Sequence, residues 1–259
     1  MDIPLGRIVW YQLNATDMDA AVEFYCAING WKSAEWPASD DPYVLLSTDS
    51  GTVGGVMAIP AEAQAGGAPQ HWLMYIATPD VERSAAQAVD NGASVYVPPA
   101  DLPDVGRFAV LADPQGAAFA LYAPTEPPQD KPFAPGLGDV SWHELVTTNY
   151  AAAMNFYGEQ FGWVMTEAMD MGDMGAYQMF GRHGVSLGGM YNKTPDMPAP
   201  PRWLLYFKVR DVQASAQQVA GLGGKVLNGP MEVPGGDFIV QCLDPQGGAF
   251  ALHSARPAA

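Results

Sequence analysis

The chain has 259 residues, of which 48% are hydrophobic, so it is long enough to bury the cores of two ordinary domains. Twelve Lys and Arg against 28 Asp and Glu give a formal net charge of −16, which repels phosphate backbones and anionic lipids. Nucleic-acid and membrane partners are therefore not expected. No uncharged apolar run approaches the ~18 residues of a transmembrane helix, and the first residues lack the features of a signal peptide.

Two cysteines indicate the redox environment. Cys26 lies in an apolar helix pattern, Cys242 lies in a predicted strand, and neither has a CxxC partner. The pattern predicts buried structural thiols. A reducing cytoplasm is the expected location.

The dominant feature of the sequence is a tandem repeat. Residues 7–31 align without a gap on residues 139–163, an offset of 132, and nine of the 25 pairs are identical. The later parts align at an offset of 131, through the Asp-Pro-Gln-Gly sequences at 113–116 and 244–247. A period this long is too large for a solenoid. The repeat predicts two domains, residues 1–123 and 139–259, joined by a linker at 124–138.

The first copy begins with an apolar run at residues 8–14 that is typical of a strand. Thr16-x-x-Asp19 resembles a capping box, apolar residues follow at helical spacing, and Gly30 is placed to end the helix. Residues 43–46 and 53–59 are predicted as strands. A second module follows, with a strand at 72–77, a helix at about 80–90 and further strands up to residue 122.

Proline-rich segments separate these modules. Residues 123–138 carry five prolines and no hydrophobic periodicity, which predicts a semi-rigid linker. Residues 60–69 and 194–201 occupy the same relative place within each copy, so each copy divides into two modules. The predicted order is β-α-β-β-β, four times, and the fold class is α+β.

These motifs carry a family resemblance. A first strand, a Thr-Asp or Thr-Asn cap, an A-x-x-F-Y helix that ends in Gly-Trp, and a final D-P-x-G hairpin resemble the vicinal oxygen chelate superfamily. This group includes glyoxalase I, bleomycin-resistance proteins and extradiol dioxygenases, and the chain looks especially like its tandem two-domain glyoxalase-like members. The resemblance covers nearly the whole chain twice. It implies two glyoxalase-like domains, each with a curved eight-stranded mixed sheet and a concave ligand cavity.

The resemblance also implies where a divalent metal would bind. Metal-dependent members place ligands at positions that here hold apolar side chains, namely Trp10 and Trp142, Leu73 and Leu204, Ala120 and Ala251, and the apolar stretches 54–56 and 188–190. None of these side chains offers an N, O or S ligand of the kind that such metals need. No cofactor is therefore predicted. A shifted divalent-metal site at Glu144 and His253 is the alternative.

Strand residues alternate between the two faces of a sheet, which assigns side chains to the implied cavity. The predicted ligand-binding residues are Trp10, Gln12, Tyr75, Tyr122, Trp142 and Tyr206. Only the second copy adds an ionisable pair, Glu144 and His253, at the positions of Gln12 and Tyr122. A carboxylate beside an imidazole can transfer a proton near neutral pH, so these two are the predicted catalytic residues.

Three other histidines are not expected to act in catalysis. His143 falls off the cavity face and is predicted to be a hydrogen-bonded histidine under the helix. His183 lies in a predicted hairpin turn, and His71 is expected in a loop before its strand.

Two functions follow from these residues. The first is a small-molecule-binding protein of the glyoxalase/bleomycin-resistance type, which takes a small, partly apolar organic ligand without the standard metal ligands. The alternative is a glyoxalase-like lyase, or a dioxygenase or hydroxylase, that acts on a small carbonyl or aromatic substrate through a non-standard site in the second domain. An oligomer is not required, because the two copies can pair within one chain.

Overall fold

A computed structural model describes residues 3–37, 41–126 and 133–256. The elements of the first copy follow in chain order: β1 (Ile8–Ala15), α1 (Met18–Asn29), β2 (Lys32–Glu35), β3 (Tyr43–Thr48), β4 (Gly51–Ala58), α2 (Ala61–Ala65), β5 (His71–Ala77), α3 (Val81–Asp90), β6 (Ser94–Leu102), β7 (Gly106–Ala112) and β8 (Ala118–Pro124). No helix in this described part of the chain is long and apolar enough to cross a membrane.

The second copy repeats this order without the short helix α2. Its elements are β9 (Val140–Thr147), α4 (Tyr150–Phe161), β10 (Val164–Asp170), the 3₁₀ turn η1 (Gly172–Met174), β11 (Ala176–Arg182), β12 (Val185–Asn192), β13 (Arg202–Lys208), α5 (Val212–Gly221), β14 (Lys225–Glu232), β15 (Phe238–Leu243) and β16 (Ala249–Ser254).

Each copy forms one eight-stranded mixed sheet with the same topology. The strand orders are β2-β3-β4-β1-β5-β8-β7-β6 and β10-β11-β12-β9-β13-β16-β15-β14. The pairs β1–β4 and β5–β8 are parallel, while the hairpin pairs are antiparallel. The predicted α+β class and the fourfold β-α-β-β-β plan are confirmed.

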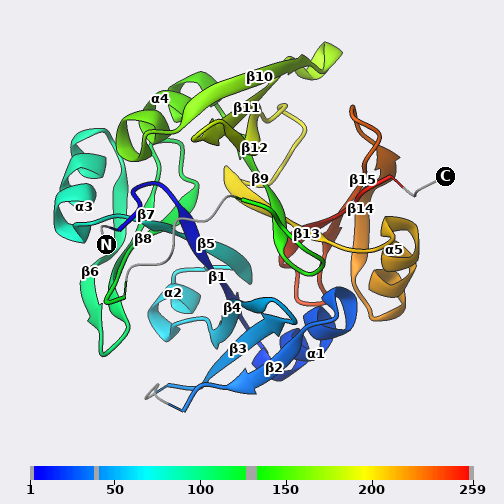
Figure 1. Ribbon diagram of the computed structural model, residues 1–259, viewed down its shortest axis with the longest axis horizontal. Coiled ribbons are helices and arrows are strands. Elements are labelled where there is room, and N and C mark those ends of the chain that lie inside the picture. Colours follow the sequence, from blue (N-terminus) through cyan, green and yellow to red (C-terminus); the bar gives the residue numbers. More distant parts are fainter. Residues whose placement is uncertain (1–2, 38–40, 127–132, 257–259) are drawn as a thin grey trace. The chain divides into compact units, whose positions relative to one another are not determined.

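The chain divides into two compact units, and each unit contains one module from each copy. The first unit comprises Met1–Trp10, Leu73–Phe133 and His143–Trp203. The second comprises Tyr11–Trp72, Ala134–Trp142 and Leu204–Ala259. In the first unit, α3 packs along β6, β7 and β8, as Figure 1 shows.

A buried tyrosine–aspartate bond joins the two copies inside each unit. In the first unit, the Tyr157 hydroxyl of α4 donates to Asp113 Oδ2 at 3.0 Å, and in the second unit Tyr25 of α1 donates to Asp244 Oδ2 at 2.8 Å. Oδ1 of each aspartate accepts two backbone N–H groups of its own Asp-Pro-Gln-Gly turn, all at 2.9 Å. Burial raises the pKa of both tyrosines well above the ordinary value, and the neighbouring carboxylate adds to this.

The tryptophan after each Gly-terminated helix makes a second hydrogen bond between the copies. Trp31 Nε1 donates to the carbonyl of Gly138, and Trp163 Nε1 donates to that of Gly6, both at 2.8 Å. The two glycines occupy the same place before the first strand of each copy. The identical Tyr and Trp residues of the repeat therefore hold one copy to the other.

Helix α1 begins one residue later than the capping box predicts. Asp17, not Thr16, is the N-cap, because its Oδ1 accepts the N–H of Ala20 at 3.1 Å. The Thr16 hydroxyl donates instead to Gln246 Oε1. Gly30 ends the helix at φ 69°, as predicted, since this left-handed conformation suits glycine.

Several other expectations need correction. His71 is the first residue of β5 instead of a loop residue. The segment 60–69, which separates the two modules of the first copy, contains the short helix α2. Cys26 is half-buried, while Cys242 is buried as predicted. The linker prediction falls partly on residues 127–132, which lie outside the described residues. Ala123 and Pro124, which were predicted at the start of the linker, are instead the last residues of β8. The described residues 125–126 and 133–138 form no helix or strand.

Replacing Tyr157 by Phe tests the tyrosine–aspartate bond. The change removes a donor to a buried carboxylate and also the acceptor of Trp203 Nε1, which lies 3.0 Å from the hydroxyl. We expect a loss of about 1.5–3 kcal/mol in the free energy of unfolding, measured by urea titration. Tyr96→Phe, at an exposed position, is the control and should change stability little. Equal effects of the two changes would contradict the structural role of the bond.

Candidate functional site

The positions that resemble a metal site are filled by packed apolar side chains. In the second unit, Leu204, Tyr206 and Ala251 form a buried cluster against which Trp142, Ile239 and Ala249 pack. Tyr206 and Ala251 are direct neighbours in the parallel pair β13–β16. These residues do not fit a divalent metal. Within the described ranges, no three His, Cys, Asp or Glu side chains are grouped so that they could hold one.

The first copy has the corresponding cluster in the first unit. Leu73, Tyr75 and Ala120 are buried, and Trp10, Phe108, Val110, Ala118 and Tyr122 pack against them. This places the predicted residues Trp10, Tyr75 and Tyr122 together. The Tyr122 hydroxyl donates to the carbonyl of Val105 at 3.0 Å, and burial raises its pKa. The polar end of this tyrosine is thus held by the protein's own backbone.

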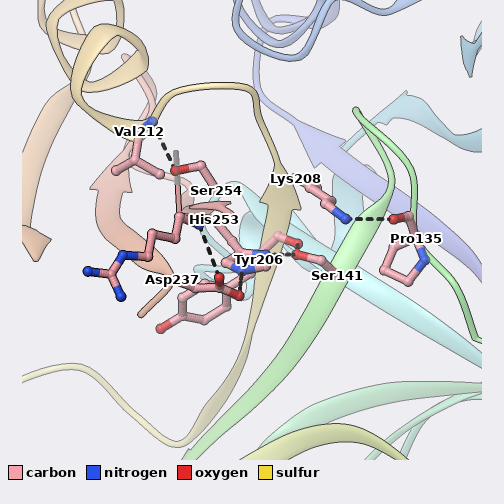
Figure 2. A network of polar contacts seen from close by, with 9 residues as sticks. Pro135, Ser141, Tyr206, Lys208, Val212, Asp237, His253 and Ser254 are labelled. Atoms are coloured by element: carbon pink, nitrogen blue, oxygen red, sulfur yellow. Dashed lines mark hydrogen bonds and ion pairs between the residues drawn. The ribbon is translucent and has the colours of Figure 1, made fainter. Parts of the chain in front are cut away.

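The second copy has a polar network in the same place, drawn in Figure 2. His253 Nδ1 lies 2.9 Å from Ser141 Oγ, and Nε2 lies 2.9 Å from Asp237 Oδ2. A carboxylate only accepts hydrogen bonds, so Nε2 carries a hydrogen. Gln241 Nε2 donates to the Tyr206 hydroxyl at 2.9 Å. An imidazole, a carboxylate, an amide and a phenol therefore gather beside the apolar cluster.

The two copies differ by coupled changes at matching positions. His253 pairs with Ile239 across the β15–β16 ladder, just as Tyr122 pairs with Phe108 across β7–β8. Asp237 corresponds to Gly106, where an added Cβ would lie too close to the Ala123 carbonyl oxygen and 2.9 Å from Tyr122 Cε2. A larger residue cannot stand there beside the tyrosine ring. The imidazole and the carboxylate thus occur together in one copy, and the tyrosine and glycine in the other.

Sequence reasoning missed Ser141, Asp237 and Gln241. At the two offsets of the repeat they correspond to Val9, Gly106 and Val110, so three apolar or small residues become polar ones. This change is visible in the aligned copies. The role of these polar residues depends on the pairing of β15 with β16, which brings Asp237, the residue before β15, next to His253 of β16.

Glu144 belongs to the first unit and His253 to the second, and each has partners within its own unit. The buried Glu144 carboxylate accepts the Tyr177 hydroxyl at 3.2 Å. Its counterpart Gln12 is contacted in the same way by Tyr43, at 3.4 Å. The proton-transfer pair of Glu144 and His253 stays a prediction.

His143 is a buried structural histidine, and its predicted hydrogen bond is confirmed. Nδ1 donates to the carbonyl of Leu187 at 2.7 Å, and no part of the side chain is exposed. Burial lowers its pKa to about 4. His183 is exposed in the β11–β12 turn, as expected.

The pKa of His143 predicts an acid sensitivity. An unfolded histidine titrates near ~6.5, so below that pH the unfolded chain takes up a proton that the folded chain refuses. Stability should fall as the pH drops from ~6.5 to about 4, by about 3 kcal/mol from this residue. His143→Tyr places the first copy's Tyr11 residue there and should remove that part of the slope in urea titrations. An unchanged slope would contradict the assignment.

Two surface hollows in the first unit are lined by residues that were not predicted to bind a ligand. One, of about 360 Å³, is bordered by Leu5, Phe161, Gly162, Arg182 and His183. The other, of about 290 Å³, lies between Gln115 and helix α4. The Arg182 guanidinium Nε donates to the Leu5 carbonyl at the first hollow.

Family models match both copies. Residues 139–252 match the model described as the Glyoxalase/Bleomycin resistance protein/Dioxygenase superfamily, and residues 10–122 match a Glyoxalase-like domain.

Relatives are similar to the chain over almost its whole length. The Putative glyoxylase CFP32 of Mycobacterium bovis is 29% identical over 255 residues, which cover 97% of this chain and 96% of the relative. The Anthracycline biosynthesis protein DauV of Streptomyces sp. is 30% identical over 273 residues, covering 98% and 96%.

Solved structures share the fold at low identity. The 2,3-dioxygenase LapB from Pseudomonas sp. KL28 superposes with a TM-score of 0.66 at 14% identity and covers 99% of this chain and 94% of its own. The Mn(II)-bound glyoxalase from Novosphingobium aromaticivorans gives 0.62 at 15% identity, covering 98% and 82%.

Proposed function

Because the chain belongs to the glyoxalase/bleomycin resistance protein/dioxygenase superfamily, we propose that its second copy binds a small, partly apolar organic molecule without a metal at the usual ligand positions. The observation that carries this proposal is the replacement of those positions by a packed apolar cluster bordered by polar groups. Apolar walls with a few fixed polar groups are typical of small-molecule sites.

The chemistry of the second copy suits a ring that carries oxygen. Trp142 and Tyr206 offer aromatic surface, on which a planar ligand can stack. Both ring nitrogens of His253 are bonded to Ser141 and Asp237, so the imidazole borders this surface as a fixed planar group, and Gln241 is held beside it by the Tyr206 hydroxyl. Side chains held in this way need little reorganisation on binding. The first copy, with Val110 and Tyr122 at those positions, has fewer polar groups to offer a ligand.

The names of the relatives support a small organic ligand. Two relatives are named a putative glyoxylase and an anthracycline biosynthesis protein, and a structural neighbour is a 2,3-dioxygenase. These names refer to different reactions, so they support a small organic molecule as the ligand and do not support one particular reaction.

A second candidate function is a lyase or dioxygenase-type reaction in which Glu144 transfers a proton. Its support is the carboxylate of Glu144, which is buried and carries a hydrogen bond from Tyr177. A buried carboxylate is the kind of group that serves as a general base. This candidate needs an activating group that the standard positions do not supply.

Substitutions in the second copy test the binding proposal. Catechol is the probe, and isothermal titration of the intact protein is the measurement. His253→Ala and Trp142→Ala should weaken catechol binding about tenfold, because each removes contact surface or a fixed polar group. Glu23→Ala, at an exposed position of α1, is the control and should change little. Equal losses from all three variants, or no binding by the unmodified protein, would contradict the proposal.

Metal analysis separates the two candidate functions. Purified protein, analysed by inductively coupled plasma spectrometry, should carry far less than one zinc, nickel, manganese or iron per chain, because the standard positions offer no donor atoms. A stoichiometric metal that disappears in Glu144→Gln or His253→Ala would overturn the metal-free proposal and favour the enzyme.

A further inference from the structure

The first copy contains a continuous chain of hydrogen bonds that the second copy lacks. In the second unit, the Tyr43 hydroxyl donates to Gln12, Gln12 Nε2 donates to Asn14 Oδ1 at 3.1 Å, and Asn14 Nδ2 donates to His71 Nε2 at 3.2 Å. His71 Nδ1 then donates to the carbonyl of Pro69 at 2.8 Å. Both ring nitrogens of His71 are therefore satisfied within the protein.

The same positions in the second copy hold Tyr177, Glu144, Val146 and Arg202. Tyr177 still donates to Glu144, but valine has no polar atom with which to continue the chain. Arg202, in the place of His71, is left without the partner that Asn14 provides in the first copy. The chain of hydrogen bonds is broken at one residue, Val146.

Arg202 is consequently a partly buried guanidinium with unused donors. Its Nε is buried and has no hydrogen-bond acceptor in the described part of the chain. Among the buried side-chain atoms of the described residues that lack a partner, Arg202 Nε is the one that belongs to a charged group. No hydrogen bond or ion pair of Arg202 occurs among the described residues. Buried donors in native proteins nearly always have partners, so an orphaned one indicates a missing water, ion or ligand.

The surroundings of Arg202 are aromatic. The rings of Tyr177 and Tyr191 stack with centroids 5.9 Å apart and planes inclined by 24°. Burial is the main cause that raises the pKa of Tyr191, and the charge of Glu144 raises it further. The charge of Arg202 lowers the pKa of Tyr191. In the parallel pair β9–β12, Tyr191 is the direct neighbour of Val146, and the counterparts of Val146 and Arg202 in the first copy, Asn14 and His71, are in hydrogen-bond contact. The strand pairing therefore places Tyr191 on the same part of the sheet as Arg202.

We propose that Arg202 anchors the carboxylate of an aromatic acid whose ring lies against Tyr177 and Tyr191. Nε and one terminal nitrogen of a guanidinium form a planar fork that matches the two oxygens of a carboxylate. A phosphate would also bind such a fork, but the stacked tyrosine rings favour a flat organic acid. This site lies in the first unit, apart from the groups of the second unit used in the proposed function, and stands independently of it.

Benzoate and its neutral analogue benzamide are the probes. Isothermal titration of the full chain should give measurable benzoate binding, with benzamide about tenfold weaker, because the charge-assisted fork needs the carboxylate. Arg202→Gln should remove most of the benzoate binding without changing the response to benzamide. Arg202→Lys should recover part of it, since lysine keeps the charge but not the fork.

A double substitution that introduces the residues of the first copy distinguishes loss of the binding site from misfolding. Val146→Asn with Arg202→His rebuilds the satisfied pair of the first copy and should also lose benzoate binding, with an unchanged circular dichroism spectrum. Arg210→Gln, at an exposed position, is the matched control and should bind benzoate normally. Equal benzoate affinity in the unmodified protein and Arg202→Gln, or no benzoate binding at all, would overturn the proposal. Catechol binding that persists in Arg202→Gln would show that the proposed function stands apart from this site.

Discussion

The hydrogen bond between a buried helix tyrosine and the aspartate of an Asp-Pro-Gln-Gly turn is the constraint on which the architecture depends. It occurs once in each compact unit, and each time the tyrosine and the aspartate come from different copies. Oδ1 of the aspartate fixes its own turn, and Oδ2 receives the tyrosine. One carboxylate thus shapes a hairpin and binds the other copy. Losing it would leave a buried hydroxyl and several backbone donors unpaired.

This shared framework explains how the two copies could diverge at their binding surfaces. Six residues that the copies share hold the copies together: Tyr25 and Tyr157, Trp31 and Trp163, and Asp113 and Asp244. Shared strand residues such as Trp10 and Trp142 lie instead in the apolar clusters. Sheet positions that do not take part in these contacts can differ between the copies. There the second copy replaces Tyr122 and Gly106 by His253 and Asp237, and Asn14 and His71 by Val146 and Arg202. The first exchange creates the hydrogen-bonded imidazole and carboxylate of the second copy, and the second leaves Arg202 Nε without an acceptor among the described residues.

The fold could be predicted from the sequence because its signals are local and occur twice. Gly30 and Gly162 end their helices as expected, since a left-handed residue needs glycine. The partners of the motif residues could not be predicted in this way. Nothing local in Tyr25 or Asp244, 219 residues apart, says that they meet. Thr16 was misassigned for the same reason, because its partner Gln246 is 230 residues away.

The candidate site was predicted only in part. Alternation along the strands placed Trp10 with Tyr75 and Tyr122, and Trp142 with Tyr206, but it did not reveal Ser141 and Asp237 beside His253. Their role depends on pairing between distant strands. The central claim, that each unit is built from both copies, is tested most directly by cutting the chain in the linker. A protease site placed within residues 124–138 and cleaved under native conditions should leave one particle of full mass in size-exclusion chromatography with light scattering. Two separate, folded halves would contradict it.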